Sequence, residues 1–201
     1  VSEMAFSPDG RLLAAGSLNG SVQMWRADTG VPYGDPLVHG EPMPGISFGV
    51  AFSPDGSRLA SVAADGTLKL WDVHTHTLAV PTMQQPGRVD ALAFNPDGET
   101  IATGASGGVT FWNVSDGTRL TSPFSYHGWV FNLAFSPDGT LLATASSDSH
   151  VRLWDMESGQ QTVPPMQHGG TVSGVAFSPD GALLVTGAAD HTARLWDVAT
   201  G

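Results

Sequence analysis

The sequence contains no cysteine, which excludes disulfide scaffolds, thiolate metal sites and cysteine nucleophiles at once. Basic side chains are scarce, with 8 lysines and arginines against 19 aspartates and glutamates. Phosphate binding requires clustered basic side chains, so we expect no nucleic acid and no anionic membrane among the partners. No uninterrupted apolar run approaches the roughly 18 residues that a membrane-spanning helix needs.

The first ten residues, VSEMAFSPDG, have neither the basic region nor the apolar region of a secretory signal peptide. We therefore expect a cytoplasmic location. The chain starts with valine instead of methionine, and on that ground we expect it to be a segment of a longer polypeptide.

Turn-forming residues are abundant, with 25 glycines and 14 prolines among 201 residues. Frequent turns and the scarcity of long helical patterns indicate an all-β chain. Most of the acidic residues lie in these turns, because aspartate accepts hydrogen bonds from nearby backbone N–H groups. The net charge of −11 is therefore weak evidence for a basic partner.

A repeat of 41 to 46 residues fills the chain. The string Phe-Ser-Pro-Asp-Gly, or Phe-Asn-Pro-Asp-Gly in the third copy, begins at Phe6, Phe52, Phe94, Phe135 and Phe177. A tryptophan follows in each copy, at Trp25, Trp71, Trp112, Trp154 and Trp196. A fixed period of this length is typical of repeat architectures built from one supersecondary unit.

The last unit illustrates the strands that each repeat predicts. Residues 172–176 form a first strand, and the turn 178–181 leads to a second strand at 183–186. A second turn at 189–191 precedes a third strand at 193–196. Earlier units add an outer strand, which two prolines suit in residues 160–166 because an edge strand can spare an N–H group.

On these features the chain resembles the WD40 repeat β-propellers over its whole length. The Trp-Asp dipeptide of that family is intact in the second, fourth and fifth units, and is Trp-Arg and Trp-Asn in the first and third. The resemblance implies four-stranded antiparallel blades in a single propeller segment, 1–201. The expected units are 1–38, 39–83, 84–126, 127–167 and 168–201, with the last lacking its outer strand. We expect an incomplete, open ring; a five-bladed ring with a truncated blade is the alternative.

The resemblance also implies a buried hydrogen-bonded set of His, Ser or Thr, Asp and Trp in regular blades. By position the three sets are His39, Ser61, Asp65 and Trp71; His127, Thr144, Asp148 and Trp154; and His168, Thr186, Asp190 and Trp196. In the first unit Ala15 and Asn19 replace the hydroxyl and the Asp, and in the third either Gln85 or Pro86 replaces the His. Such a set resembles a nucleophilic triad, but its recurrence in several blades favours a structural role.

Partner contacts in such propellers usually fall on the rim formed by the loops that enter the innermost strands. The positions four and six residues before each Phe predict this rim: Ile46, Phe48, Arg88, Asp90, Trp129 and Phe131. Trp129 is the one tryptophan outside the repeated position, and clustered aromatic side chains dominate protein interfaces. Two interpretations remain open: exposed recognition, or packing between blades.

The sequence therefore favours a non-catalytic scaffold for protein–protein interaction within a larger signalling or regulatory protein, with a protein or peptide partner and no cofactor or metal. The near-uniform repeats resemble the arrays often attached to bacterial signalling kinases or ATPases, so we expect a bacterial source. The same resemblance gives one alternative, a sensor domain that regulates a kinase or ATPase domain. Another is a propeller enzyme, a hydrolase or lyase, with its site at the channel mouth. We also expect further blades or another chain to complete the ring.

Overall fold

The structure is a computed structural model that describes residues 3–17, 19–40, 49–124, 126 and 128–201. In these residues the regular elements are nineteen β-strands in five antiparallel sheets. None of the described residues forms a helix long and apolar enough to span a membrane. The predictions of an all-β chain, of one sheet for each repeat and of an open propeller are confirmed.

The strands follow one another in the same order in every sheet, from the innermost to the outermost. The first two sheets consist of β1 (Glu3–Phe6), β2 (Leu12–Gly16), β3 (Ser21–Arg26) and β4 (Leu37–Val38), and of β5 (Gly49–Phe52), β6 (Arg58–Val62), β7 (Thr67–Asp72) and β8 (Met83–Gln84). The third consists of β9 (Val89–Phe94), β10 (Thr100–Ala105), β11 (Gly108–Asn113) and β12 (Arg119–Leu120). The fourth consists of β13 (Val130–Phe135), β14 (Leu141–Ser146), β15 (His150–Asp155) and β16 (Met166–Gln167), and the fifth of β17 (Val172–Phe177), β18 (Leu183–Ala188) and β19 (Ala193–Asp197).

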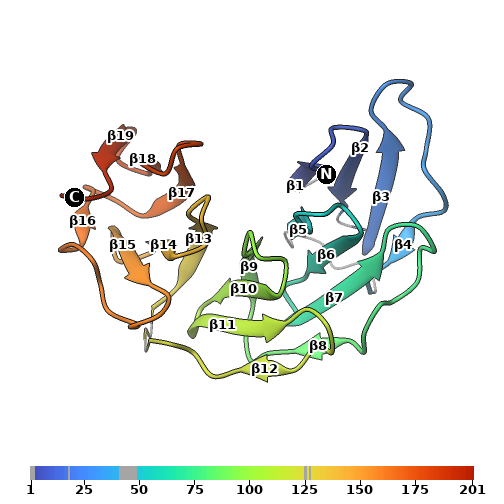
Figure 1. Ribbon diagram of the computed structural model, residues 1–201, viewed down its shortest axis with the longest axis horizontal. Coiled ribbons are helices and arrows are strands. Elements are labelled where there is room, and N and C mark those ends of the chain that lie inside the picture. Colours follow the sequence, from blue (N-terminus) through green and yellow to red (C-terminus); the bar gives the residue numbers. More distant parts are fainter. Residues whose placement is uncertain (1–2, 18, 41–48, 125, 127) are drawn as a thin grey trace.

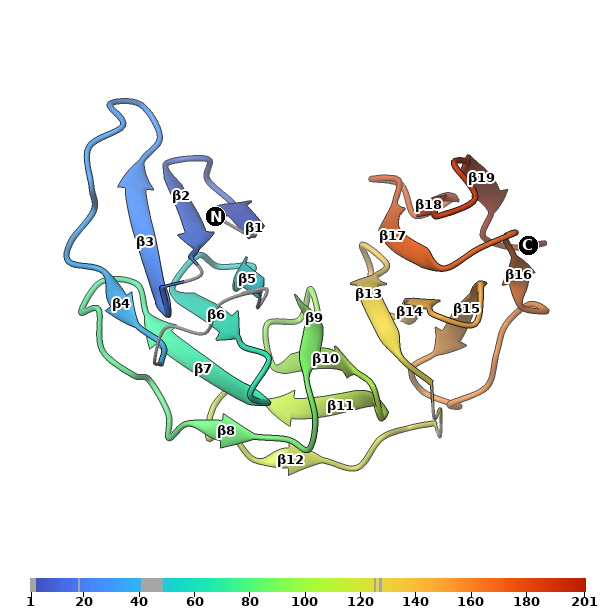
Figure 2. The ribbon, with the colours of Figure 1, turned by 180° about the vertical axis from the view of Figure 1, so that it is seen from behind.

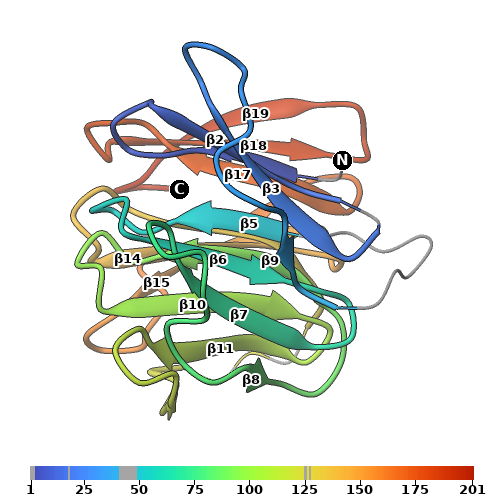
Figure 3. The same cartoon turned by 90° about the vertical axis from the view of Figure 1, so that its right-hand side faces the viewer.

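The sheets are blades arranged in an arc around a common centre (Figure 1). Each innermost strand contacts the innermost strand of the next blade, from β1 through β5, β9 and β13 to β17. The view from behind shows the first and last blades at the two ends of an open arc (Figure 2). From the side, the axes of β5, β10 and β11 are nearly aligned, although β10 and β11 are antiparallel (Figure 3).

The repeated Ser-Pro-Asp-Gly turn makes the first hairpin of each blade, as the fourth blade shows. The Ser136 hydroxyl donates to the Asp138 carboxylate at 2.6 Å, and the same carboxylate accepts the Thr140 backbone N–H at 3.1 Å. Gly139 has φ of +75°, a left-handed conformation that side chains other than glycine rarely adopt. Local chemistry therefore fixes the point at which the chain reverses.

The apolar core lies between neighbouring blades and not within one sheet. Between the third and fourth blades, Ala102 and Phe111 pack against Leu133, Leu142 and Trp154, all of them buried. Burial of each large side chain contributes about 1.5–3 kcal/mol, so every blade depends on its neighbours. Neighbouring blades are thus joined by shared apolar clusters.

The two ends of the arc expose apolar side chains that the inner blades bury. Phe6 is 64% exposed, whereas its repeat equivalent Phe52 is 8% exposed against the first blade. At the other end Leu195 is 65% exposed, whereas its equivalent Leu153 is fully buried against the fifth blade. The difference arises because each end of the arc has no neighbouring blade to cover these side chains, as expected for an open ring.

Candidate functional site

In four of the five blades the repeated tryptophan donates its indole N–H to a buried hydroxyl on the second strand. The bonds join Trp71 to Ser61 at 2.8 Å, Trp112 to Thr103 at 2.9 Å, Trp154 to Thr144 at 3.0 Å and Trp196 to Thr186 at 2.8 Å. Sequence analysis did not include the pair in the third blade. The first blade has Ala15 at the hydroxyl position.

His39 extends this pair in the second blade. Its Nδ1 lies 2.6 Å from the Ser61 hydroxyl and its Nε2 lies 2.7 Å from the Thr67 hydroxyl. Thr67 in turn donates to Asp65 at 2.6 Å, so its oxygen must accept from Nε2–H, and Nδ1 then accepts from Ser61. The expected Asp65 therefore reaches His39 through Thr67. Burial is the main cause that lowers the pKa of His39 to about 4, which keeps the ring neutral.

His168 in the fifth blade has the opposite ring orientation. Its Nε2 lies 2.7 Å from the Thr186 hydroxyl, and its Nδ1 lies 3.4 Å from the Asp190 carboxylate. Asp190 also accepts from the Thr192 hydroxyl and from the Gly169 backbone N–H, and these bonds hold its pKa well below the usual range. The predicted members of this set lie together, with Thr192 as an addition.

In the third blade a side-chain amide contacts the second-strand hydroxyl, at the position where the second and fifth blades have an imidazole. The Thr103 hydroxyl donates to the Gln85 side-chain oxygen at 2.6 Å, and both residues are buried. Of the two candidates that the sequence left open, Gln85 therefore occupies the histidine position. A neutral acceptor is sufficient there because the hydroxyl needs only one acceptor for its proton.

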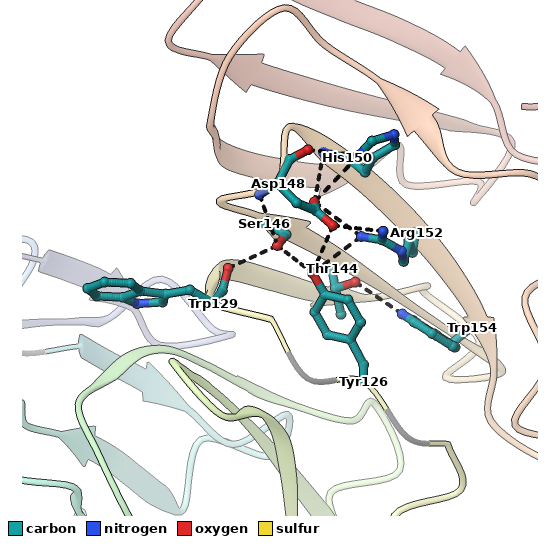
Figure 4. A network of polar contacts seen from close by, with 8 residues as sticks. All are labelled: Tyr126, Trp129, Thr144, Ser146, Asp148, His150, Arg152 and Trp154. Atoms are coloured by element: carbon teal, nitrogen blue, oxygen red, sulfur yellow. Dashed lines mark hydrogen bonds and ion pairs between the residues drawn. The ribbon is translucent and has the colours of Figure 1, made fainter.

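The fourth blade differs from the predicted set. His127 lies outside the described residues. The neighbouring Tyr126 contacts the blade (Figure 4). The Tyr126 hydroxyl lies 2.5 Å from the Ser146 hydroxyl and 3.4 Å from Asp148. Asp148, expected to be buried, has a side chain that is 41% exposed and pairs with Arg152 at 2.8 Å. The carboxylate is held in this exposed position by the Arg152 guanidinium, with bonds of 2.8 and 3.2 Å, and by the Tyr126 hydroxyl.

None of the hydroxyls in these sets is available to a substrate. Ser61 and Thr144 have no exposed surface, and Thr186 has 1%. Each oxygen accepts an indole N–H, and Ser61 and Thr186 also bond to an imidazole. The geometry supports a structural function for the triad-like sets, because a nucleophile must reach the substrate.

The predicted rim residues that the structure describes form one cluster between the third and fourth blades; Ile46 and Phe48 lie outside the described residues. Asp90 accepts a hydrogen bond from Arg88 Nε at 2.5 Å and another from Trp129 Nε1 at 2.7 Å. The Trp129 ring stacks on Phe131, with ring centroids 5.1 Å apart. We call Arg88, Asp90, Trp129 and Phe131 the rim cluster.

Exposure within the rim cluster is uneven. The Asp90 side chain is only 6% exposed, whereas the Arg88 side chain is 39% exposed and Trp129 is 38% exposed. Trp129 therefore combines the two alternatives that the sequence left open: its N–H bonds across the blade boundary, and part of its ring faces solvent.

A second anchor holds the backbone of Trp129. Its carbonyl oxygen accepts from the Ser146 hydroxyl and from the Ser147 N–H, each at 3.0 Å. Figure 4 shows the carbonyl directed at Ser146 while the indole extends away from the polar network around Tyr126. Tyr126 also lies under the Arg152 guanidinium, 4.8 Å from the ring centroid. Tyr126 and Trp129 are thus both bonded to Ser146 at the end of β14.

Sequence analysis missed Tyr126 and Ser146, although the repeat contains the signal. Tyr126 stands nine residues before Phe135, as Gln85 and His168 stand nine residues before their own Phe. Ser146 stands two residues after Thr144, where the second, third and fifth units have alanine. Three departures from the repeat, Tyr126, Trp129 and Ser146, therefore meet in one blade.

A surface pocket of about 540 Å³ lies elsewhere, beside the Ser-Pro-Asp-Gly turn of the second blade and the Asn-Pro-Asp-Gly turn of the third. Its charged groups are engaged locally: Asp55 accepts from Ser53 and Ser57, and Arg58 pairs with Asp72 at 3.0 Å. In the described part of the chain no group of three His, Asp or Glu side chains is placed to hold a metal ion.

Comparison with known proteins gave two results. A family model described as "WD domain, G-beta repeat" matches residues 1–26, 44–72, 78–113, 117–155 and 160–197. Among solved structures, the chain is similar to the computationally designed Ika8 protein, with 26% sequence identity and a TM-score of 0.79. The alignment covers 98% of this chain and 58% of the designed protein, so the chain spans little more than half of that length. A search of the curated proteins found no match.

Proposed function

The chain belongs to the WD40 repeat family, whose propellers are typically non-catalytic platforms for protein partners, and on that premise we propose that it binds a protein partner through the rim cluster. One observation carries the proposal: Trp129 is 38% exposed and yet bonded through both its indole N–H and its carbonyl. Its indole N–H bonds to Asp90 and its carbonyl bonds to Ser146.

Rigid aromatic side chains are effective interface anchors. A tryptophan that is already fixed loses little side-chain freedom on binding, so more of the burial energy contributes to affinity. Tryptophan, tyrosine and arginine are also the residues most enriched among interface hot spots. The rim cluster contains a Trp and an Arg side by side, joined to the same carboxylate.

The departures from the repeat support the same site. A residue that recurs in every blade has a structural function in the blade, whereas a residue that departs from the repeat is a better candidate for binding a partner. Tyr126 and Ser146 hold the loop of Trp129, and none of the other described blades has this Tyr–Ser pair. We infer further that the arc acts within a larger ring; the apolar side chains exposed at its two ends and the 58% coverage of the designed Ika8 protein support this inference. We also propose that this ring belongs to a larger signalling or regulatory protein.

Affinity capture with the immobilised chain tests the proposal. We expect proteins retained by the natural chain to be lost with Trp129→Ala, while the melting temperature changes by only a few degrees. Leu78→Ala is the control, because Leu78 is 42% exposed and lies outside the rim cluster. Equal retention by Trp129→Ala and by the natural chain would exclude the rim cluster as the binding site.

A further inference from the structure

Only some of the functional groups in the rim cluster are accessible to a partner. Both oxygens of Asp90 accept hydrogen bonds within the cluster, and the side chain is nearly buried. A cationic group of a partner therefore has no open carboxylate to bind. What faces solvent is the outer end of Arg88 and the ring of Trp129.

Asp90 fixes the Arg88 guanidinium through Nε alone. Among the described residues no side chain or carbonyl bonds to its two terminal nitrogens. These nitrogens form the planar edge that matches a carboxylate with two parallel hydrogen bonds. A fixed guanidinium with a free outer edge is preorganised for an anionic group.

From these contacts we propose, on the premise of the protein-binding function above, that the rim cluster recognises a peptide segment with an Asp or Glu side chain next to an aromatic or aliphatic one. Arg88 binds the carboxylate and the stacked pair of Trp129 and Phe131 binds the apolar side chain. Arg88 and Trp129 share one carboxylate, so they lie close together. The two groups of the partner must be equally close, as residues i and i+2 on one side of an extended segment are.

Charge favours a carboxylate over a phosphate. Phosphopeptide sites generally use clusters of arginines, whereas the rim cluster has one guanidinium that Asp90 already neutralises in part. The net charge of −11 also opposes a long acidic tract, although repulsion beyond about 8 Å is largely screened at physiological salt. One or two carboxylates are therefore the favoured number.

Selection from phage-displayed random dodecapeptides tests this class of partner. For the natural chain we expect enrichment of Asp or Glu within two residues of an aromatic or aliphatic residue. Arg88→Gln should keep the apolar preference and lose the acidic one, because glutamine can still donate to Asp90 but has no guanidinium edge. Arg119→Gln, at an exposed arginine on β12, is the matched control and should select as the natural chain does.

A selected peptide then separates the possible outcomes. Replacement of its Asp by Asn should weaken binding to the natural chain about tenfold, which corresponds to about 1.4 kcal/mol, and should leave binding to Arg88→Gln unchanged. Peptides that need Trp129 but show no acidic preference would overturn the proposed class and leave the protein-binding function standing. Tighter binding of a phosphoserine analogue than of the Asp peptide would also overturn it. Selection of no peptide, or of peptides that bind Trp129→Ala equally well, would overturn both proposals.

Discussion

The indole N–H of Trp129 donates to the carboxylate of Asp90 at 2.7 Å, across the boundary between the fourth and third blades. The two residues are 39 positions apart in the chain, nearly one full repeat. This bond joins an exposed aromatic ring to β9, an innermost strand that contacts the innermost strands of both neighbouring blades. It also uses the second oxygen of Asp90, so that Arg88 remains the available charge at the rim.

A double-mutant cycle should detect this bond as a coupling in the free energy of unfolding. Trp129→Phe keeps an aromatic ring without the N–H group, and Asp90→Ala removes the acceptor. Bonds to charged acceptors are worth about 1.5–3 kcal/mol, and solvent exposure of Trp129 reduces this, so we expect a coupling of about 1 kcal/mol. Urea unfolding of the four proteins measures it. Strictly additive effects would mean that the bond contributes nothing to stability.

Ser146→Ala should loosen the loop that carries Trp129 without unfolding the blade. The substitution removes the bonds to the Trp129 carbonyl and the Tyr126 hydroxyl, and we expect a loss of about 1 kcal/mol in stability. Affinity for a rim-binding peptide should fall several-fold, because binding must then order the ring. Ser17→Ala, at the same repeat position in the first unit, is the control and should leave affinity unchanged. Unaltered affinity for Ser146→Ala would argue against a fixed loop as the source of binding.

The pH dependence of stability should follow the neutral state of His39. Burial lowers the pKa of this imidazole to about 4, whereas an unfolded histidine titrates near 6.5. The stability that the neutral ring supports is fully present above pH 6.5 and is lost as the pH falls from 6.5 towards 4. Between pH 7.5 and pH 5 we expect a loss of about 2 kcal/mol from this residue.

His39→Gln provides the matched variant for this test, because the third blade already uses Gln85 in the same place. Its side-chain oxygen can accept from Ser61 and cannot acquire a proton in this range. Unfolding midpoints in urea at several pH values should therefore decline less for His39→Gln than for the natural chain. Identical declines would assign the acid sensitivity to other groups.

Thr144→Val should destabilise the fourth blade by about 1–3 kcal/mol. Valine has nearly the shape of threonine but strands the Trp154 indole N–H in a site with no exposed surface at position 144. Thr162→Val, at an exposed threonine of the same blade, should change stability by less than about 0.5 kcal/mol. Thermal unfolding compares the two variants. If the melting temperature falls no further for Thr144→Val than for Thr162→Val, the tryptophan–hydroxyl bond does not stabilise the blade.

The fold follows from the sequence because its determinants are local and repeated. Turns such as Ser136–Gly139 close through hydrogen bonds within five residues, and a tryptophan and its hydroxyl partner are ten residues apart in three of the units. A period is visible without any knowledge of which blades touch. The count of five repeats left both an open ring and a closed five-bladed ring possible, and the exposure of Phe6 and Leu195, which favours the open ring, is a property of the assembled arc.

The details of the site depend on competition between neighbours, which a pattern does not resolve. Asp65 reaches its histidine through Thr67, and Asp148 turns outward to Arg152, although both acids hold the same repeat position. The hydrogen bond that positions the exposed Trp129 ring has its acceptor, Asp90, in another blade. Counting back from each Phe would have pointed to Tyr126, but the distances to Ser146 and Asp148 require the folded chain.

Hydrogen exchange of the chain with and without a bound peptide or protein partner tests the central claim most directly. The account predicts slower exchange of backbone amides in residues 87–91 and 128–132, at the rim cluster. Exchange in residues 53–58 and 95–99, the turns beside the 540 Å³ pocket, should stay unchanged. Protection of those turns with no change at the rim would contradict the account.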